Sequence, residues 1–180
     1  MYGMVNQAIE QMVLRAHGPD VWRDIQRRAG LTVEGFISNE AYPDEVTYQL
    51  VGAASECLGQ PAERILHAFG EHWVLHTARE HYGPMLAATG STLPEFLEHL
   101  PRLHDRVVLI YPKLMPPRIE VTDRAERSLR LHYTSTRPGL APFMGGLLSG
   151  LGQLFGTPTK VTLERPRGAA GGTDIFRVEW

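Results

Sequence analysis

The segment Tyr133-Thr-Ser-Thr-Arg137 carries a phenol, a hydroxyl and a guanidinium at alternate positions. Successive side chains of a β-strand point to opposite faces, so this spacing predicts that Tyr133, Ser135 and Arg137 share one face. A guanidinium can bind a carboxylate through two parallel hydrogen bonds, and each hydroxyl can donate one more. The segment therefore predicts a carboxylate-binding site, although an exposed polar strand face would show the same pattern.

A second candidate is the imidazole of His104. Leu100, His104 and Val107 recur at intervals of three and four residues, which places the imidazole on the apolar stripe of a helix. Such a histidine is either a satisfied core residue or a metal ligand, and composition alone favours the core residue. Haem needs only one protein ligand, because the porphyrin supplies four, and it also carries two carboxylates. His104 together with the carboxylate-binding segment therefore indicates haem.

Two other patterns give weaker signals. His72 and His76 lie one helical turn apart with Glu80 one turn further, but no glutamate follows His72, so we expect a solvated helix face rather than a zinc site. The glycines of residues 145–156 lack the spacing and the lysine of a phosphate-binding loop. They are better explained as small positions that let this helix approach another surface closely.

Composition narrows the function further. The 180 residues fit a single domain, and 18 basic against 20 acidic residues without a basic run favour neither nucleic acid nor a membrane surface as partner. Cys57 is the only cysteine, so no disulfide forms within the chain and haem would bind non-covalently. No run approaches the roughly 20 apolar residues of a membrane span, and no leader pattern opens the chain. We expect a cytoplasmic protein.

Periodicity predicts an α+β fold. Helical patterns cover residues 5–18, 19–30, 43–59, 61–83 and 93–111, the last with a break or restart at Pro101. A proline-rich stretch then gives way to strands at 118–122, 128–135, 161–165 and 175–180, with one more helix at 141–155. The expected architecture is a helical subdomain of about residues 1–111 packed on an antiparallel sheet subdomain of about 112–180, with haem buried between them.

The sequence resembles the haem nitric oxide/oxygen binding (H-NOX) domains, bacterial sensors similar to the haem domain of soluble guanylate cyclase. The resemblance implies that His104 is the proximal iron ligand, that Tyr133, Ser135 and Arg137 hold the propionates of haem b, and that Pro117 presses on the porphyrin and distorts it. It rests on these segments: Met1-Tyr-Gly-Met-Val-Asn6, Asp44-Glu-Val-Thr-Tyr-Gln-Leu-Val-Gly-Ala-Ala-Ser-Glu56, Phe69-Gly-Glu-His-Trp73, Leu103-His-Asp-Arg-Val107, Pro116-Pro117 and Tyr133-Thr-Ser-Thr-Arg137.

One position departs from the oxygen-binding members of that family. Those members carry a distal tyrosine five residues after the arginine of the motif, where this chain has Pro142. Without that donor, bound oxygen gains no hydrogen bond, so nitric oxide and carbon monoxide are the expected ligands. Trp73 matches a tryptophan of some cyanobacterial members, and its indole either contacts the distal ligand or simply packs. The remaining expected distal residues are Val5, Phe143, Met144 and Leu147.

The resemblance also implies a mechanism and a partner. Nitric oxide would weaken the bond between iron and His104, and the helix that carries His104 would move. A separate protein, a histidine kinase or a cyclic-di-GMP enzyme, would read that movement. An alternative is a haem carrier without gas signalling. An enzyme such as a peroxidase is least favoured, because no distal acid–base pair is visible.

Overall fold

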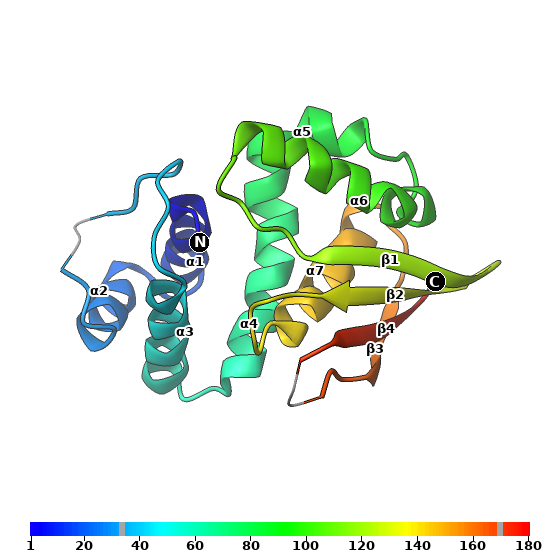
Figure 1. Cartoon of the computed structure of the whole chain (residues 1–180). Coiled ribbons are helices and arrows are strands. Elements are labelled where there is room, and N and C mark those ends of the chain that lie inside the picture. The colour runs from blue at the N-terminus through cyan, green and yellow to red at the C-terminus, as the bar shows by residue number, and fades with distance from the viewer. Residues whose placement is uncertain (33–34, 169–170) are drawn as a thin grey trace. The chain divides into compact units, whose positions relative to one another are not determined.

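The computed structural model describes residues 1–32, 35–168 and 171–180, and these fall into two compact units, Met1–Phe69 and Gly70–Trp180. Figure 1 traces the order of the elements: the helices up to α6 come first along the chain, and the strands follow with α7 between the second and the third of them. The boundary between the units precedes the change from helix to strand. The helix that carries His104 therefore belongs to the same unit as the sheet.

The first unit is helical. It contains α1 (Gly3–His17), α2 (Pro19–Arg28), α3 (Asp44–Leu58) and the start of α4 (Ala62–His72). Gly18 adopts a positive φ of 83° between α1 and α2, and Pro19 then opens α2, as the glycine and proline positions predict. Inside the unit the hydroxyl of Thr47 donates to the side-chain carbonyl of buried Asn6 at 2.7 Å.

The helices of the second unit differ from the predictions in two ways. After α4, the chain forms a π-helical turn, η1 (Trp73–Ala78), and continues as α5 (Arg79–Ala87). The predicted break at Pro101 is wrong, because α6 (Leu93–Ile110) is continuous through it. Buried Leu97 and Leu103 on either side of Pro101 hold α6 against the core, which outweighs the backbone hydrogen bond that proline removes.

The strands form one antiparallel sheet in the order β1-β2-β4-β3. They are β1 (Arg118–Ala125), β2 (Ser128–Thr134), β3 (Lys160–Arg165) and β4 (Thr173–Glu179), and α7 (Ala141–Leu154) lies between β2 and β3 in the chain. Leu129, Leu131 and Tyr133 alternate as buried residues along β2, and they share one core cluster with side chains of α6 and α7. Helices followed by an antiparallel sheet confirm the α+β class.

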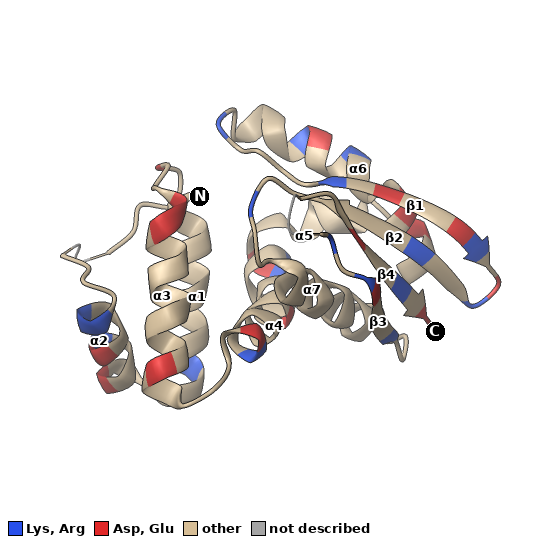
Figure 2. Cartoon of the chain, turned by 60° about the horizontal axis from the view of Figure 1, so that its bottom comes forward, with Lys and Arg blue, Asp and Glu red and all other residues tan. Residues whose placement is uncertain are grey.

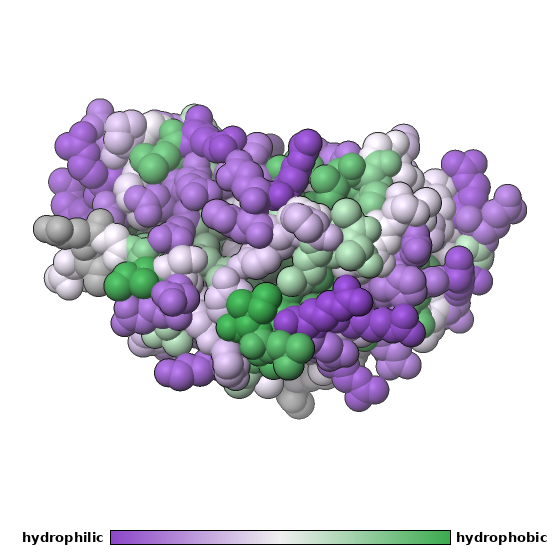
Figure 3. Space-filling model, turned by 90° about the horizontal axis from the view of Figure 1, so that it is seen from above, coloured by the Kyte–Doolittle hydropathy of each residue, from purple (hydrophilic) through white to green (hydrophobic). Residues whose placement is uncertain are grey.

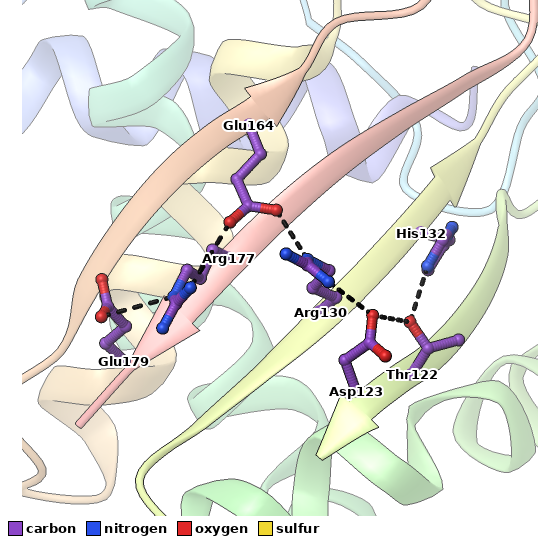
Figure 4. A network of polar contacts seen from close by, with 7 residues as sticks. All are labelled: Thr122, Asp123, Arg130, His132, Glu164, Arg177 and Glu179. Atoms are coloured by element: carbon purple, nitrogen blue, oxygen red, sulfur yellow. Dashed lines mark hydrogen bonds and ion pairs between the residues drawn. The ribbon is translucent and has the colours of Figure 1, made fainter. Parts of the chain in front are cut away.

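The opposite face of the sheet is charged. Acidic and basic residues are spread over its strands, whereas α7 carries no charged residue (Figure 2). On that face Arg130 bridges Glu164 and Asp123 at 2.7 Å each, and Glu164 lies 3.8 Å from Arg177 (Figure 4). All these side chains are partly exposed, so their ion pairs contribute little to stability individually.

The surface is largely hydrophilic, with hydrophobic side chains gathered in a few separate patches on the face drawn in Figure 3. Large exposed hydrophobic residues include Leu109, Ile110 and Met115, at the end of α6 and in the loop that follows it. Within the described ranges, no helix combines the length and the apolar character that a membrane crossing requires.

Candidate functional site

The carboxylate-binding segment leaves the sheet earlier than strand alternation predicts. Strand β2 ends at Thr134, whose neighbours across the sheet, Arg118 and Thr173, are themselves the first residues of β1 and β4. Since no paired strand continues beyond them, Ser135 and Arg137 lie in a turn. The prediction that alternation places all three donors on one strand face is therefore wrong.

A local hydrogen bond organises that turn instead. The backbone N–H of Arg137 donates to the hydroxyl oxygen of Ser135 at 3.1 Å. Burial raises the pKa of Tyr133, although a hydrogen bond from Ser135 and the charge of Arg137 act in the opposite direction. The Tyr133 phenol is therefore protonated at neutral pH and can donate to a carboxylate. Tyr133 is buried, whereas Ser135 and Arg137 are half-buried.

The same segment contacts the loop that follows α6. The guanidinium of Arg137 donates from Nη1 to the backbone carbonyl of Met115 at 2.9 Å. Met115 lies in the loop of residues 111–117, which connects α6 to β1 and contains Pro117. Arg137 thus links the end of β2 to the connection that leads from His104 into the sheet.

His104 itself is half-buried on α6, and its Nδ1 is buried with no hydrogen-bond partner among the described residues. Burial lowers the pKa of His104, while the backbone of Pro117 and the charge of Asp105 oppose that effect more weakly. A lowered pKa keeps the imidazole neutral at neutral pH, and a neutral imidazole retains the lone pair that binds a metal. These properties fit an axial ligand of haem, and the donors after β2 fit its propionates.

The predicted distal residues occupy apolar surroundings. Met144 is a member of the core cluster of the second unit, and half-buried Trp73 and Leu147 pack against that cluster. Phe143 is half-buried in the first turn of α7, and Pro142 precedes it as the second residue of that helix. Val5 lies on α1 in the first unit, so it belongs to a different compact unit from the other candidates.

Glycines bring the α4–η1 junction and α7 close together, as the glycine-rich pattern predicts. A Cβ added to Gly70 would lie 2.6 Å from the backbone nitrogen of Leu147, and one added to Gly150 would lie 3.1 Å from Cβ of Val74. The two segments therefore meet with almost no side chain between them. Such close approach is the physical use of glycine within a helix.

The histidines of the α4–η1 junction are not on a fully solvated face. His72 is buried, and its ring centroid lies 4.7 Å from that of His76. The prediction of a solvated face is thus wrong for His72. Among the residues that the structure describes, no group of three or more potential metal ligands gathers around them or elsewhere.

Two residues beside the carboxylate-binding segment belong to no sequence motif, so the sequence alone could not identify them. Arg167 contacts the backbone carbonyls of Ser135 and Arg137, and buried Asp174 accepts a hydrogen bond from the backbone of Arg167. Their spacing along the chain is unrelated to any known site. Only the pairing of β2 with β4, which puts Asp174 opposite Tyr133, brings them together.

Comparison with known proteins identifies the family. Residues 2–163 match the family described as haem-NO-binding. The chain belongs to the haem-NO-binding (H-NOX) family. Members of this family are haem-binding gas-sensor domains related to soluble guanylate cyclase, and they are not themselves catalytic. The predicted family resemblance is confirmed.

Relatives include soluble guanylate cyclases of two animals. The protein gcy-35 of Caenorhabditis elegans is 31% identical over 152 residues, which cover 82% of this chain and 22% of that protein. Soluble guanylate cyclase 89Da of Drosophila melanogaster is 25% identical over 175 residues, or 96% of this chain and 26% of that protein. The chain thus spans about a quarter of the length of these relatives.

Solved structures share the fold. The H-NOX protein of S. oneidensis in its Fe(II)NO state superposes with a TM-score of 0.88 at 19% identity, covering 99% of this chain and 98% of that one. An oxygen complex of an H-NOX domain gives a TM-score of 0.83 at 20% identity, covering 99% and 94%. At these identities the likeness shows the H-NOX fold alone.

Proposed function

We propose that this H-NOX chain is a single haem-binding domain that holds haem b non-covalently and senses nitric oxide, with carbon monoxide as a second ligand. His104 would bind the iron, Tyr133, Ser135 and Arg137 would hold the propionates, and Pro117 would press on the porphyrin. A bound haem would supply an iron that can bind both His104 and a gas. The observation that carries the proposal is the half-buried His104, whose Nδ1 has no partner in the described part of the chain, in the same unit as Tyr133, Ser135 and Arg137.

The ligand preference rests on the distal residues. We propose that Trp73, Phe143, Met144 and Leu147, all of the Gly70–Trp180 unit, surround the gas. Pro142 has no donor to offer it, and α7 contributes no charge. Oxygen bound to iron is strongly polar and depends on a donor, whereas nitric oxide and carbon monoxide do not. The apolar side chains of α7 therefore favour the less polar gases.

The signal would be the release of His104. In this proposal His104 ties α6 to the iron, while Arg137 holds the following loop at the carbonyl of Met115. When His104 is released, α6 can shift while the loop stays attached to the end of β2, which provides two states of one element. A separate partner, a histidine kinase or a cyclic-di-GMP enzyme, would read the shift.

The test is the absorption spectrum of the purified, reduced protein, recorded in air and again with nitric oxide. We expect bound haem in a one-to-one ratio, no stable oxygen complex, and a spectral change with nitric oxide. Protein that contains no haem after expression with added haem precursor contradicts the whole proposal. A stable oxygen complex contradicts the ligand preference and leaves haem binding intact.

A further inference from the structure

Arg167 lies between β3 and β4 and reaches the segment that follows β2. Its Nη1 donates to the backbone carbonyl of Ser135 at 2.7 Å, and its Nη2 donates to the backbone carbonyl of Arg137 at 2.5 Å. One planar guanidinium thus bonds to two residues of the carboxylate-binding segment at once. These two carbonyls lie just beyond the last paired residues of β2, where the sheet no longer holds the backbone.

Asp174 fixes Arg167 in turn. Its Oδ1 accepts the backbone N–H of Arg167 at 2.8 Å, and its Oδ2 lies 3.9 Å from Nε of Arg167. The side chain of Asp174 is 2% exposed and that of Arg167 is 14% exposed, so water screens this ion pair poorly. Asp174 is directly opposite Tyr133 in the pairing of β2 with β4.

This arrangement differs from the ion pairs on the outer face of the sheet. Arg130 contacts the carboxylates of Asp123 and Glu164, and its side chain is 40% exposed. Arg167 instead donates to backbone carbonyls of a turn, and Asp174 lies directly opposite Tyr133 across the sheet. A buried charge is costly unless it is paired, so the contacts of Arg167 define its position tightly.

We infer that Arg167, held by Asp174, is a positioning residue that fixes the backbone of Ser135 and Arg137 so that their side chains converge with Tyr133 on a carboxylate. This role rests on the proposed haem function, because the carboxylates would be the propionates. Arg167 acts through the turn rather than by binding the propionates itself. The bonds from the Arg137 amide to Ser135 and from the Arg137 guanidinium to Met115 do not involve these two backbone carbonyls, which Arg167 holds.

The first arm of the test needs no haem. In the haem-free full chain, Arg167→Gln should raise the hydrogen-exchange rate of the Arg137 amide about tenfold, because a hydrogen bond to a charged donor holds the turn at each of two carbonyls. The control, Arg130→Gln, makes the same change of charge on β2 and should leave that amide unchanged. Equal exchange in Arg167→Gln and the unsubstituted protein overturns the inference, whatever the outcome for haem binding.

The second arm measures haem loss to an excess of apomyoglobin. Arg167→Gln should release haem about tenfold faster than the unsubstituted protein, and Arg130→Gln should not. Arg167→Lys keeps the charge but loses the planar fork, so we expect only partial rescue. Full rescue by lysine would assign the effect to charge and overturn the positioning role.

Asp174→Asn supplies an independent variant if Arg167→Gln does not fold. The asparagine keeps an acceptor for the Arg167 amide but removes the charge beside Nε, so exchange at Arg137 should rise, less than in Arg167→Gln. Resonance Raman bands of the propionates should also shift in these variants. Failure of the unsubstituted protein to bind haem would refute the proposed function, while the exchange arm would still decide the role of Arg167.

Discussion

The polar and apolar parts of the Gly70–Trp180 unit are built in different ways. Helix α6, the loop after it and the end of β2 carry specific atoms: the imidazole of His104, and the guanidinium of Arg137 on the carbonyl of Met115. The α4–η1 junction and α7 contribute mainly shape, since glycines let their backbones approach closely. We call these two parts the polar side and the apolar side. Removing one polar group from the polar side should therefore abolish or weaken haem binding. Adding a methyl group on the apolar side should instead lower the free energy of unfolding.

The largest expected effect is on the polar side. His104→Gly should abolish one-to-one haem retention, because no other described residue is a candidate axial ligand in the same position, and added imidazole should restore it. The readout is the ratio of haem to protein after purification. His99→Gly is the matched control, since it introduces the same helix-weakening glycine into α6 while removing only a ring contact with the Thr89 carbonyl. Unchanged haem content in His104→Gly would refute the assignment of His104 as the iron ligand.

The next effect concerns the carboxylate-binding segment. Arg137→Gln should weaken haem binding by about 2 kcal/mol, roughly thirtyfold, because it loses a charged donor to a propionate. The rate at which haem dissociates in the presence of a haem scavenger measures this loss of affinity. Arg118→Gln, at an exposed position of β1, should have no effect. Similar haem loss from both variants would show that the segment is not a specific carboxylate site.

On the apolar side a methyl group should cost stability. Gly70→Ala would place Cβ against the backbone of α7, so we expect a loss of about 2 kcal/mol in the free energy of unfolding. Gly52→Ala is the control, since its Cβ would meet no atom within 4 Å inside α3, and we expect a gain of about 0.5–1 kcal/mol. Chemical denaturation of both variants measures these changes in the free energy of unfolding. A stabilised Gly70→Ala variant would mean that the close approach is not required.

A hydrogen-bond donor introduced on the apolar side should make the protein bind oxygen more tightly. Pro142→Tyr, in the first turn of α7, should increase oxygen affinity about tenfold through one new hydrogen bond. The spectrum of the reduced protein in air measures it, and Pro142→Phe supplies the ring without the hydroxyl. Equal oxygen affinity in the two variants would show that the absent donor does not determine the ligand preference.

Sequence reasoning succeeded where local pattern decides structure. Glycine and proline positions predicted the limits of α1 and α2, and the glycine-rich run predicted a closely approached helix. The chemistry of Tyr133 and Arg137 and the apolar spacing around His104 could also be read from residue types. In each case the information lies within a few residues along the chain.

It failed where distant pairing decides structure. Strand β2 ends at Thr134 because both of its neighbours begin there, which no property of residues 133–137 reveals. The contact of Arg167 with the turn depends on the register of β2 against β4, and the continuity of α6 through Pro101 depends on tertiary packing. The polar side is therefore recognisable by its residue types, but its geometry is set by the sheet.

The most direct test of the central claim is a titration of the reduced, haem-loaded protein with nitric oxide, followed by absorption spectroscopy. Release of His104 predicts that the iron becomes five-coordinate, with nitric oxide as its only axial ligand. A complex that remains six-coordinate at every ratio of nitric oxide to protein would show that His104 stays bound, and would contradict this account of signalling.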